Sequence, residues 1–505
     1  MDNKIILLLL FSIICGFAIR IYPHTQVYRF MNEEPYNYIT VDEILTTGIT
    51  KNQGFYPIFE HQVIAYFSQI FHIDPISLSI IFNPLISALT AIPIFLIFRK
   101  YLKDGQSLLI SLFWCLSEAV FYRSAGFYTT EPLSLFFMFF ALYFYTRKNY
   151  VGVASFAVLS LITHLLPFAF LSATIFAEKF IFGSRKFQII SILGIVSTAI
   201  FVYSPLNPYR RIVSILDINY MMSKFNIGNI FNLYDLNTLK SGVMLFYGTL
   251  ILIVITMFCV IQLVGQRLSI FSGDLKLNLD AATKISISML LVSFGLVAFS
   301  WIVYNSMLFA PPRLLLFTIV PLSFFVVFWI NQPAVHGRSR IMLIFVICSM
   351  MVCSSFAGSQ TMLWSNNSLT KNEYLALDEI QQTFGFDRAI VWWCDYPINT
   401  EITSRVRNDV IWEVNISPSV MIEYFKKVSQ ENSTLSNDTI HIIKYAFISE
   451  RMKQEGMFIQ FTETRTIHSR RPVIDIWNNN INWKLVYDNH GVKVYERLDY
   501  TELLK

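Results

Sequence analysis

The chain has 505 residues, of which 54% are hydrophobic and only 14% are charged, with 46 Phe and 25 Tyr. A soluble globular protein carries about 25% charged residues, so this composition excludes a wholly soluble protein. The formal net charge of +5 requires no nucleic-acid partner, because basic residues gather in the cytoplasmic loops of multi-spanning membrane proteins.

Charged residues are concentrated towards the C-terminus. Residues 371–505 hold 35 of them, nearly as many as all the preceding residues together. This difference predicts a transmembrane domain over residues 1–357, a linker over 358–370 and an extracytoplasmic domain over 371–505. Cys394 is the only cysteine in the last of these, so we expect no disulfide within it.

Apolar stretches that approach the 17–25 residues needed to cross a bilayer recur along the first 357 residues. About eleven occur, at about 4–22, 75–98, 106–122, 131–147, 151–164, 166–183, 187–204, 242–265, 284–307, 314–331 and 341–357. The first is interpreted as an uncleaved anchor, because no small-residue cleavage site precedes Pro23. The sequence therefore predicts an α-helical polytopic membrane protein with a C-terminal mixed α/β domain.

Basic residues mark every second loop and so indicate the orientation. They lie at Arg99–Lys103, Arg147-Lys148, Arg185-Lys186, Arg267 and Arg338–Arg340. Such loops are cytoplasmic, which predicts a cell-membrane protein with a cytoplasmic N-terminus and an extracytoplasmic C-terminal domain. Four Asn-X-Ser/Thr sequons agree with this orientation; they begin at Asn366, Asn415, Asn432 and Asn437.

The C-terminal domain shows both helix and strand patterns. Residues 373–383 have near-helical apolar spacing, and residues 389–393 form a buried-strand pattern. Further strands are predicted at 440–448, 483–487 and 492–495. Asn489-His490-Gly491 supplies hairpin turn chemistry between the last two.

Carboxylates and arginines gather in the predicted outer loops. Glu34 lies in the first, Glu131 follows Arg123 in the second, and Asp217 and Asp235 lie in a later one. Arg313 follows two prolines at the start of an apolar stretch. Carboxylates from separate loops can hold a divalent cation or act as a general base, and an arginine at a helix end can bind phosphate through two hydrogen bonds. This pattern favours a phosphate-linked substrate whose lipid tail stays in the bilayer.

Three motifs in this layout resemble those of the GT-C glycosyltransferases, in particular the catalytic subunit of archaeal and bacterial oligosaccharyltransferases. That family begins its first outer loop with Asp-Pro-Tyr-Tyr, where this chain has Glu34-Pro35-Tyr36-Asn37. Its second outer loop is approximately Arg-Ser-Val-Ala-Gly-x-x-Asp-x-Asp/Glu, where this chain has Arg123-Ser124-Ala125-Gly126 and then Thr129-Thr130-Glu131. Its soluble domain carries Trp-Trp-Asp-Tyr-Gly, where this chain has Trp392-Trp393-Cys394-Asp395-Tyr396-Pro397.

The resemblance implies a membrane glycosyltransferase that uses a polyprenyl-phosphate or polyprenyl-pyrophosphate sugar donor and a protein, lipid or glycan acceptor. Glu34 and Glu131 would be catalytic, and together with Asp217 they would bind a divalent cation, Mg or Mn. Donor phosphate would contact Arg313, Arg123 and His164. The acceptor would contact Trp392, Trp393 and Asp395.

The chain departs from the family pattern at three places. Thr129 replaces the first carboxylate of the second loop, which weakens the cation site. Cys394 is inserted into the tryptophan motif and Pro397 replaces its glycine, which puts acceptor choice in doubt. The loop at 205–241 is shorter than the family's mobile outer loop.

Plainer interpretations stand beside these. Glu33 competes with Glu34, and Glu131 could simply stabilise a helix N-terminus. Arg123 and Arg313 could anchor lipid headgroups, and His164 could be a core or loop residue. Trp392 and Trp393 are more often core residues than acceptor contacts. Two other functions also remain open, a lipid or solute transporter or flippase and a non-catalytic scaffold.

Overall fold

The computed structural model describes residues 3–25, 29–30, 34–48, 59–117, 120, 130–184, 252–257, 281–304, 311–331, 337–365, 368–386, 391–395, 398, 401–402, 405, 443–455, 457–462, 465–469 and 481–498. The chain divides into two compact units. The first contains Met1–Tyr22 and Gln53–Thr361, and the second contains Pro23–Asn52 and Met362–Lys505.

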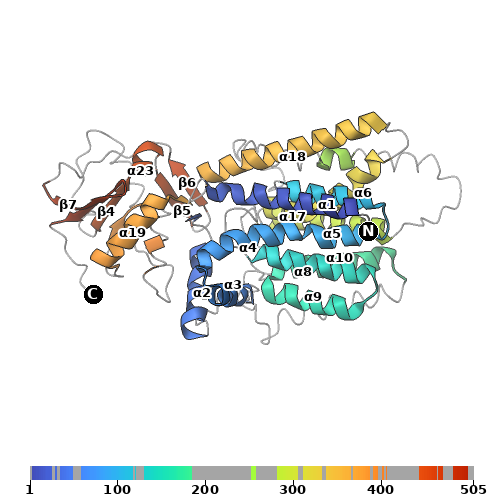
Figure 1. The fold of residues 1–505 in the computed structure, drawn as a ribbon, viewed down its shortest axis with the longest axis horizontal. Coiled ribbons are helices and arrows are strands. Elements are labelled where there is room, and N and C mark those ends of the chain that lie inside the picture. The colour runs from blue at the N-terminus through green and yellow to red at the C-terminus, as the bar shows by residue number, and fades with distance from the viewer. Residues whose placement is uncertain are drawn as a thin grey trace. The chain divides into compact units, whose positions relative to one another are not determined.

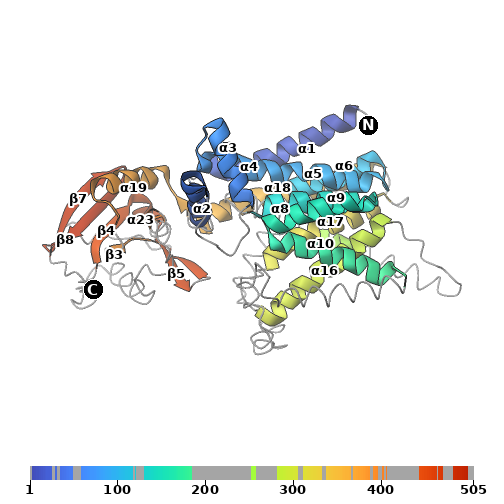
Figure 2. The same cartoon turned by 90° about the horizontal axis from the view of Figure 1, so that it is seen from below.

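The first unit is a helical bundle. Its helices are α1 (Asn3–Ile21), α3 (Phe59–Phe71), α4 (Pro75–Leu89), α5 (Ala91–Arg99), α6 (Asp104–Leu116), α8 (Glu131–Thr146), α9 (Tyr150–Thr163), α10 (Leu165–Phe182), α16 (Ala281–Tyr304), α17 (Pro311–Ile330) and α18 (Gly337–Ser365). Within this unit α1, α5, α8, α9 and α17 run side by side in both views (Figures 1 and 2).

Four described helical segments are long and apolar enough to cross a membrane, which indicates a multi-pass membrane protein. They are Asn3–His24, Pro75–Arg99, Leu165–Phe182 and Gly337–Phe356. Shorter apolar helices accompany them at Glu131–Thr146, Tyr150–Thr163, Ala281–Leu296 and Leu316–Ile330. The predicted stretch at 187–204 lies outside the described residues, and 242–265 is described only over 252–257. The inside–outside orientation stays a prediction.

Two helices of the predicted first outer loop were missed from the sequence, α2 (Glu34–Thr47) and α3. A membrane span is recognised by a long continuous apolar run, whereas the 13 residues of α3 mix polar and apolar side chains. Its buried residues include Ile64, Ala65 and Ser68, which lie on one face at helical spacing. Both helices are too short and too polar to be sought as spans.

A buried arginine ties α1 to α6. Arg20 is 0% exposed, and its guanidinium donates to the carbonyls of Cys115 at 2.7 Å and Trp114 at 3.1 Å. These carbonyls lie in the last turn of α6, where a helix leaves its C=O groups without intrahelical partners. Arg20 also donates to the Gly16 carbonyl at 2.7 Å. The end of α6 is thereby fixed immediately before the predicted second outer loop.

The second unit combines a four-stranded sheet with a covering helix, α19 (Lys371–Thr383). The sheet order is β3 (Val391–Trp393), β4 (Ile443–Ser449), β8 (Val492–Arg497) and β7 (Trp483–Asn489). The β3–β4 pair is parallel and the other two pairs are antiparallel. Helix α19 buries Ala376, Leu377 and Ile380 in the domain core, and Figure 2 shows this helix running along the sheet. This confirms the predicted mixed α/β domain.

The β7–β8 hairpin forms at the predicted turn. His490 and Gly491 connect the strands with φ values of 54° and 68°. Two successive positive φ values are the signature of the type I′ turn that matches strand twist. The predicted strands at 440–448, 483–487 and 492–495 agree with β4, β7 and β8 to within a few residues.

Besides α2, three smaller features lie in the described part of the second unit. The strand β1 (Arg29–Phe30) pairs antiparallel with β2 (Ser368–Leu369). A short helix, α23 (Glu450–Glu455), follows β4, and β5 (Met457–Thr462) pairs with β6 (Arg465–Ser469) as a separate hairpin. The residues that follow α1 therefore join a unit formed mainly by the C-terminal end of the chain.

Candidate functional site

The predicted site residues are distributed over both units. Glu131, His164 and Arg313 belong to the helical unit, whereas Glu34, Trp392, Trp393 and Asp395 belong to the second. Glu34 is the first residue of α2 and Arg313 lies in the first turn of α17. Predicted residues outside the described part of the chain are Glu33, Arg123, Thr129, Asp217 and Asp235. The shared cation site of Glu34 and Glu131 therefore stays a prediction.

Glu131 is a buried carboxylate at the beginning of an apolar helix. It is the first residue of α8 and is 1% exposed. Thr130 occupies the N-cap position but makes no capping hydrogen bond with its side chain among the described residues. The unsatisfied N–H groups in the first turn of a helix favour a carboxylate at the position that Glu131 occupies.

A small cavity adjoins Glu131. Its lining comes mainly from α4, α6, α8 and α17: Ser87, Thr90, Trp114, Val120, Glu131, Pro132, Leu135 and Leu316. The volume is about 10 Å³, which is room for about one water molecule. The carboxylate therefore has space on one side within an otherwise packed bundle.

His164 approaches Glu131 from the junction of α9 and α10. Its Nε2 lies 3.8 Å from Oε1 of Glu131, and the ring is 5% exposed. Its Nδ1 accepts a hydrogen bond from the backbone N–H of Leu166 at 3.1 Å. His164 is therefore the N-cap of α10. The structure thus brings together two of the predicted site residues.

Serine hydroxyls hold this junction in place. The Ser134 hydroxyl lies 2.9 Å from the carbonyl oxygen of Ser160 and 3.2 Å from that of His164. Ser160 in turn donates to the Ser134 carbonyl at 3.1 Å. These contacts are fully buried and join α8 to α9 one turn beyond Glu131. These hydrogen bonds consequently fix the backbone of α8 near Glu131 relative to the backbone of His164.

In the second unit, the tryptophan motif lies within the core. Trp392 and Trp393 are 3% and 1% exposed. The Trp392 ring stacks on Tyr445 at 4.6 Å and meets Phe386 edge-on at 5.5 Å. Burial, and then the nearby charge of Asp395, raise the pKa of the Cys394 thiol well above its usual range, which makes it unreactive at neutral pH.

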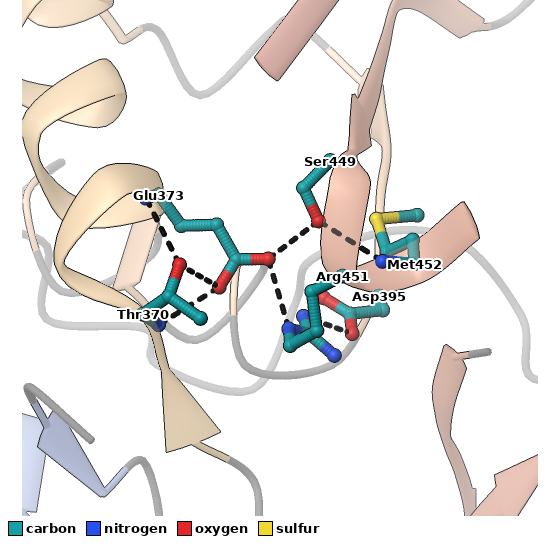
Figure 3. A network of polar contacts seen from close by, with 6 residues as sticks. All are labelled: Thr370, Glu373, Asp395, Ser449, Arg451 and Met452. Atoms are coloured by element: carbon teal, nitrogen blue, oxygen red, sulfur yellow. Dashed lines mark hydrogen bonds and ion pairs between the residues drawn. The ribbon is translucent and has the colours of Figure 1, made fainter. Parts of the chain in front are cut away.

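Asp395 is part of a buried network centred on Arg451 (Figure 3). The guanidinium donates to Asp395 Oδ2 at 2.6 Å and to Glu373 Oε1 at 2.9 Å. Glu373 also accepts from the Ser449 hydroxyl at 2.5 Å. Burial alone would lower the pKa of Arg451, but Asp395 and Glu373 outweigh it and raise that pKa above its usual range. One arginine thus links the motif segment to α19 and to the end of β4.

Three buried acids among the described residues were missed from the sequence: Glu60, Glu373 and Glu401. Glu373 had a detectable signal, because Thr370 and Glu373 form the Thr-x-x-Glu capping box at the start of α19. Glu60, in the first turn of α3, had none. It is 0% exposed, and neither carboxyl oxygen has a hydrogen-bond partner among the described residues. Burial raises the pKa of Glu60 well above its usual range.

The described residues contain no group of three His, Cys, Asp or Glu side chains that could hold a metal ion. Glu131 offers one hard oxygen donor beside a cavity, which suits Mg or Mn. His164 does not offer a second ligand, because its Nδ1 accepts a hydrogen bond and the neutral ring then carries its proton on Nε2. Glu34 and Asp217 remain the candidates for the other oxygen ligands.

No protein-family model matches the sequence, and no curated protein matches it significantly. Solved structures do match. The crystal structure of the Archaeoglobus fulgidus oligosaccharyltransferase tethered to an acceptor peptide with an NVT sequon aligns with a TM-score of 0.55. The alignment covers 93% of this chain and 74% of that one, at 11% sequence identity. The chain has an oligosaccharyltransferase-like fold.

The apo form of the same Archaeoglobus fulgidus oligosaccharyltransferase gives a TM-score of 0.53 at 10% identity, over 90% of this chain and 70% of that one. The oligosaccharyltransferase-like fold thus extends over nearly the whole length of the chain. This confirms the resemblance that the three sequence motifs indicated. At such low identity the likeness is one of fold.

Proposed function

We propose that this protein is a membrane glycosyltransferase that transfers a sugar or oligosaccharide from a polyprenyl-phosphate or polyprenyl-pyrophosphate donor to an extracytoplasmic acceptor. The observation that carries the proposal is Glu131. It is a carboxylate buried at the start of an apolar helix, in a chain of oligosaccharyltransferase-like fold, at the position of the family's second-loop motif. A bland membrane scaffold has no need of such a buried charge, which is expensive to keep.

The chemistry implied is a direct displacement at the anomeric carbon of the donor sugar. The acceptor attacks, and the lipid phosphate leaves with the electron pair of the broken bond. Glu34 and Glu131, with Asp217, would hold a divalent cation, which would neutralise charge on the departing phosphate. Glu34 would also serve as the general base for the acceptor, with Glu33 as its competitor.

Donor phosphate binding is assigned to Arg313 and Arg123, whereas His164 lies beside Glu131 and contacts that carboxylate instead. Arg313 follows Pro311-Pro312 in the first turn of α17, and it is the only Lys, Arg, Asp or Glu between Lys284 and Arg338. A guanidinium binds phosphate through two parallel N–H donors, whereas lysine offers a point charge. Arg313→Lys should therefore weaken donor use about tenfold, and a rate unchanged at limiting donor would make Arg313 a headgroup anchor.

The acceptor proposed first is a polypeptide containing Asn-X-Ser/Thr, bound near Trp392, Trp393 and Asp395. The matched Archaeoglobus fulgidus structure holds an acceptor peptide with an NVT sequon, which supports this choice by analogy. In this chain the two indoles are buried and Asp395 is paired with Arg451. We therefore expect the buried motif to support the acceptor-binding surface, and residues around Pro397 to contact the acceptor directly.

The test uses the purified full-length protein in liposomes. Lipid-linked sugars extracted from membranes of the source organism serve as donor, with paired peptides that carry Asn-X-Thr or Gln-X-Thr. Mass spectrometry should detect a glycosylated product of the Asn peptide alone. Sugar found instead on a lipid or glycan would change the acceptor class. Uptake of donor into sealed liposomes without any transfer would replace the enzyme by a flippase.

A matched pair of variants tests the assignment of Glu131. Asp104 also begins an apolar helix, α6, but it is 34% exposed and pairs with Arg99 at 3.0 Å. Glu131→Gln should reduce transfer about 100-fold or more, whereas Asp104→Asn should leave it unchanged. Equal activity of the two variants would remove Glu131 from the reaction.

A further inference from the structure

We propose that His164 is a positioning residue for Glu131: a neutral ring, fixed by the backbone of α10, that directs its Nε2–H at the carboxylate and holds it for catalysis. This role rests on the proposed function, because it matters to the reaction only if Glu131 does. It differs from the donor-phosphate contact suggested by the sequence.

The hydrogen bond at the far side of the ring fixes the tautomer. A backbone N–H can only donate, so Nδ1 must accept from Leu166 with its lone pair, at 3.1 Å. A neutral imidazole has one N–H, and it must then lie on Nε2. Nε2 is the ring atom nearest to Glu131, 3.8 Å from Oε1. The ring therefore presents a donor, not a metal-binding lone pair, to the carboxylate.

Burial gives this contact its effect. The exposed fractions of the His164 and Glu131 side chains are 6% and 2%. In surroundings of low effective dielectric constant, an N–H dipole aimed at a carboxylate stabilises the negative charge more than it does in water. The separation exceeds the 2.7–3.2 Å of a formed N–H···O bond. At 3.8 Å the contact is therefore an electrostatic one between the N–H dipole and the carboxylate.

The position of His164 is fixed independently of Glu131. It caps α10 through Leu166, and its own carbonyl lies 3.2 Å from the Ser134 hydroxyl of α8. Supporting hydrogen bonds of this kind orient a reacting or metal-binding carboxylate, and their loss costs about 10–100-fold in activity or affinity. His164 thus acts through Glu131.

Two substitutions separate capping from positioning. His164→Asn keeps a good N-cap but is too short to reach Glu131, whereas His164→Ala loses both functions. We expect His164→Asn to keep the thermal stability of the wild type and to lower kcat about tenfold at unchanged donor KM. His164→Ala should lower kcat similarly and also reduce stability. The loss should vanish when His164→Asn is added to Glu131→Gln, because the carboxylate is already gone.

A rise in donor KM at unchanged kcat would overturn the proposal in favour of a phosphate contact. Wild-type kcat in His164→Asn would overturn it altogether. The tautomer can be checked without an activity assay, by ¹H–¹⁵N NMR of the full-length protein labelled at histidine. The His164 signal is identified as the one that is absent from the spectrum of His164→Asn. It should show the Nε2–H form and should shift in Glu131→Gln.

An Nδ1–H signal, or one indifferent to Glu131→Gln, would contradict the positioning role. If no acceptor is ever glycosylated but the NMR signal behaves as expected, the contact stands and the proposed function fails. The two ideas can therefore fail separately.

Discussion

Buried carboxylates lie beside different kinds of side chain in the two units. In the second unit each has an arginine close by: Arg451 lies between Glu373 and Asp395, and Arg405 bonds Glu401 at 2.8 Å. In the helical unit Glu131 meets a neutral histidine at 3.8 Å, and Glu60 has no hydrogen-bond partner among the described residues. An arginine that satisfies a buried acid also holds it in place, so the arrangement in the second unit stabilises the core of that domain.

The largest effect should come from removing the central arginine of the second unit. Arg451→Met leaves Glu373 and Asp395 buried without their shared cation, which should cost about 3–5 kcal/mol. Hydrogen exchange of the full-length protein should show protection lost over α19 and β4. Lys453→Met is the control, since it breaks only the exposed pair with Glu450, worth about 0–1 kcal/mol. Equal protection in both variants would show that Arg451 does not hold the unit together.

Close packing at the Arg20 contact should give the next largest effect. A Cβ at Gly16 would lie 2.9 Å from Arg20 Nη1 and 3.0 Å from Cys115 Cβ. Gly16→Ala should therefore destabilise the helical unit by about 1–3 kcal/mol. A Cβ at Gly105 meets nothing within 4 Å, so Gly105→Ala should be neutral or slightly stabilising. Thermal unfolding in detergent measures both, and a neutral Gly16→Ala would mean that α1 and α6 separate easily.

Glu60 should make the protein less stable as the pH rises, whereas an acid paired with a base makes a protein more stable as the pH rises. Because burial raises its pKa above the usual 4.5, its contribution is fully present below that value and is lost as pH rises through the raised pKa. Glu60→Gln removes the titrating group and should flatten this decline as the pH rises above 4.5. A variant whose stability falls with pH as steeply as the wild type would assign the decline to other groups.

The smallest effect is expected at the exposed Glu379, on α19. Hydrogen bonds from His490, Tyr487 and Asn489 lower its pKa below the usual 4.5. Its stabilising contribution is therefore present above that value and is lost as pH falls through the lowered pKa. Thermal unfolding of the second unit should weaken less on acidification in Glu379→Gln than in the wild type. Identical acid sensitivity would show that the contact between the hairpin and α19 is not stabilising.

The sequence predicted what depends on local pattern. Apolar length identified the described bundle helices apart from α3, and Asn489-His490-Gly491 identified the hairpin. Glu131 could be placed at a helix start because an apolar run follows it. The Glu131–His164 contact and the Arg451 network could not be predicted, because they join residues from different elements. The burial of Trp392 and Trp393 agrees with the expectation that such residues are more often core residues than acceptor contacts, since a strand packed against a helix has an inner face.

The short pairing of β1 with β2 has a consequence for biosynthesis. Arg29 meets Leu369, so the second unit cannot be completed until some 340 further residues have been made. At about 5–20 residues per second, the segment after α1 waits roughly 20–70 s for its partner strand. During that interval the unpaired backbone edge of this segment needs protection, for which a chaperone is suited. Completion of the folded protein is thus timed by the synthesis of its last third.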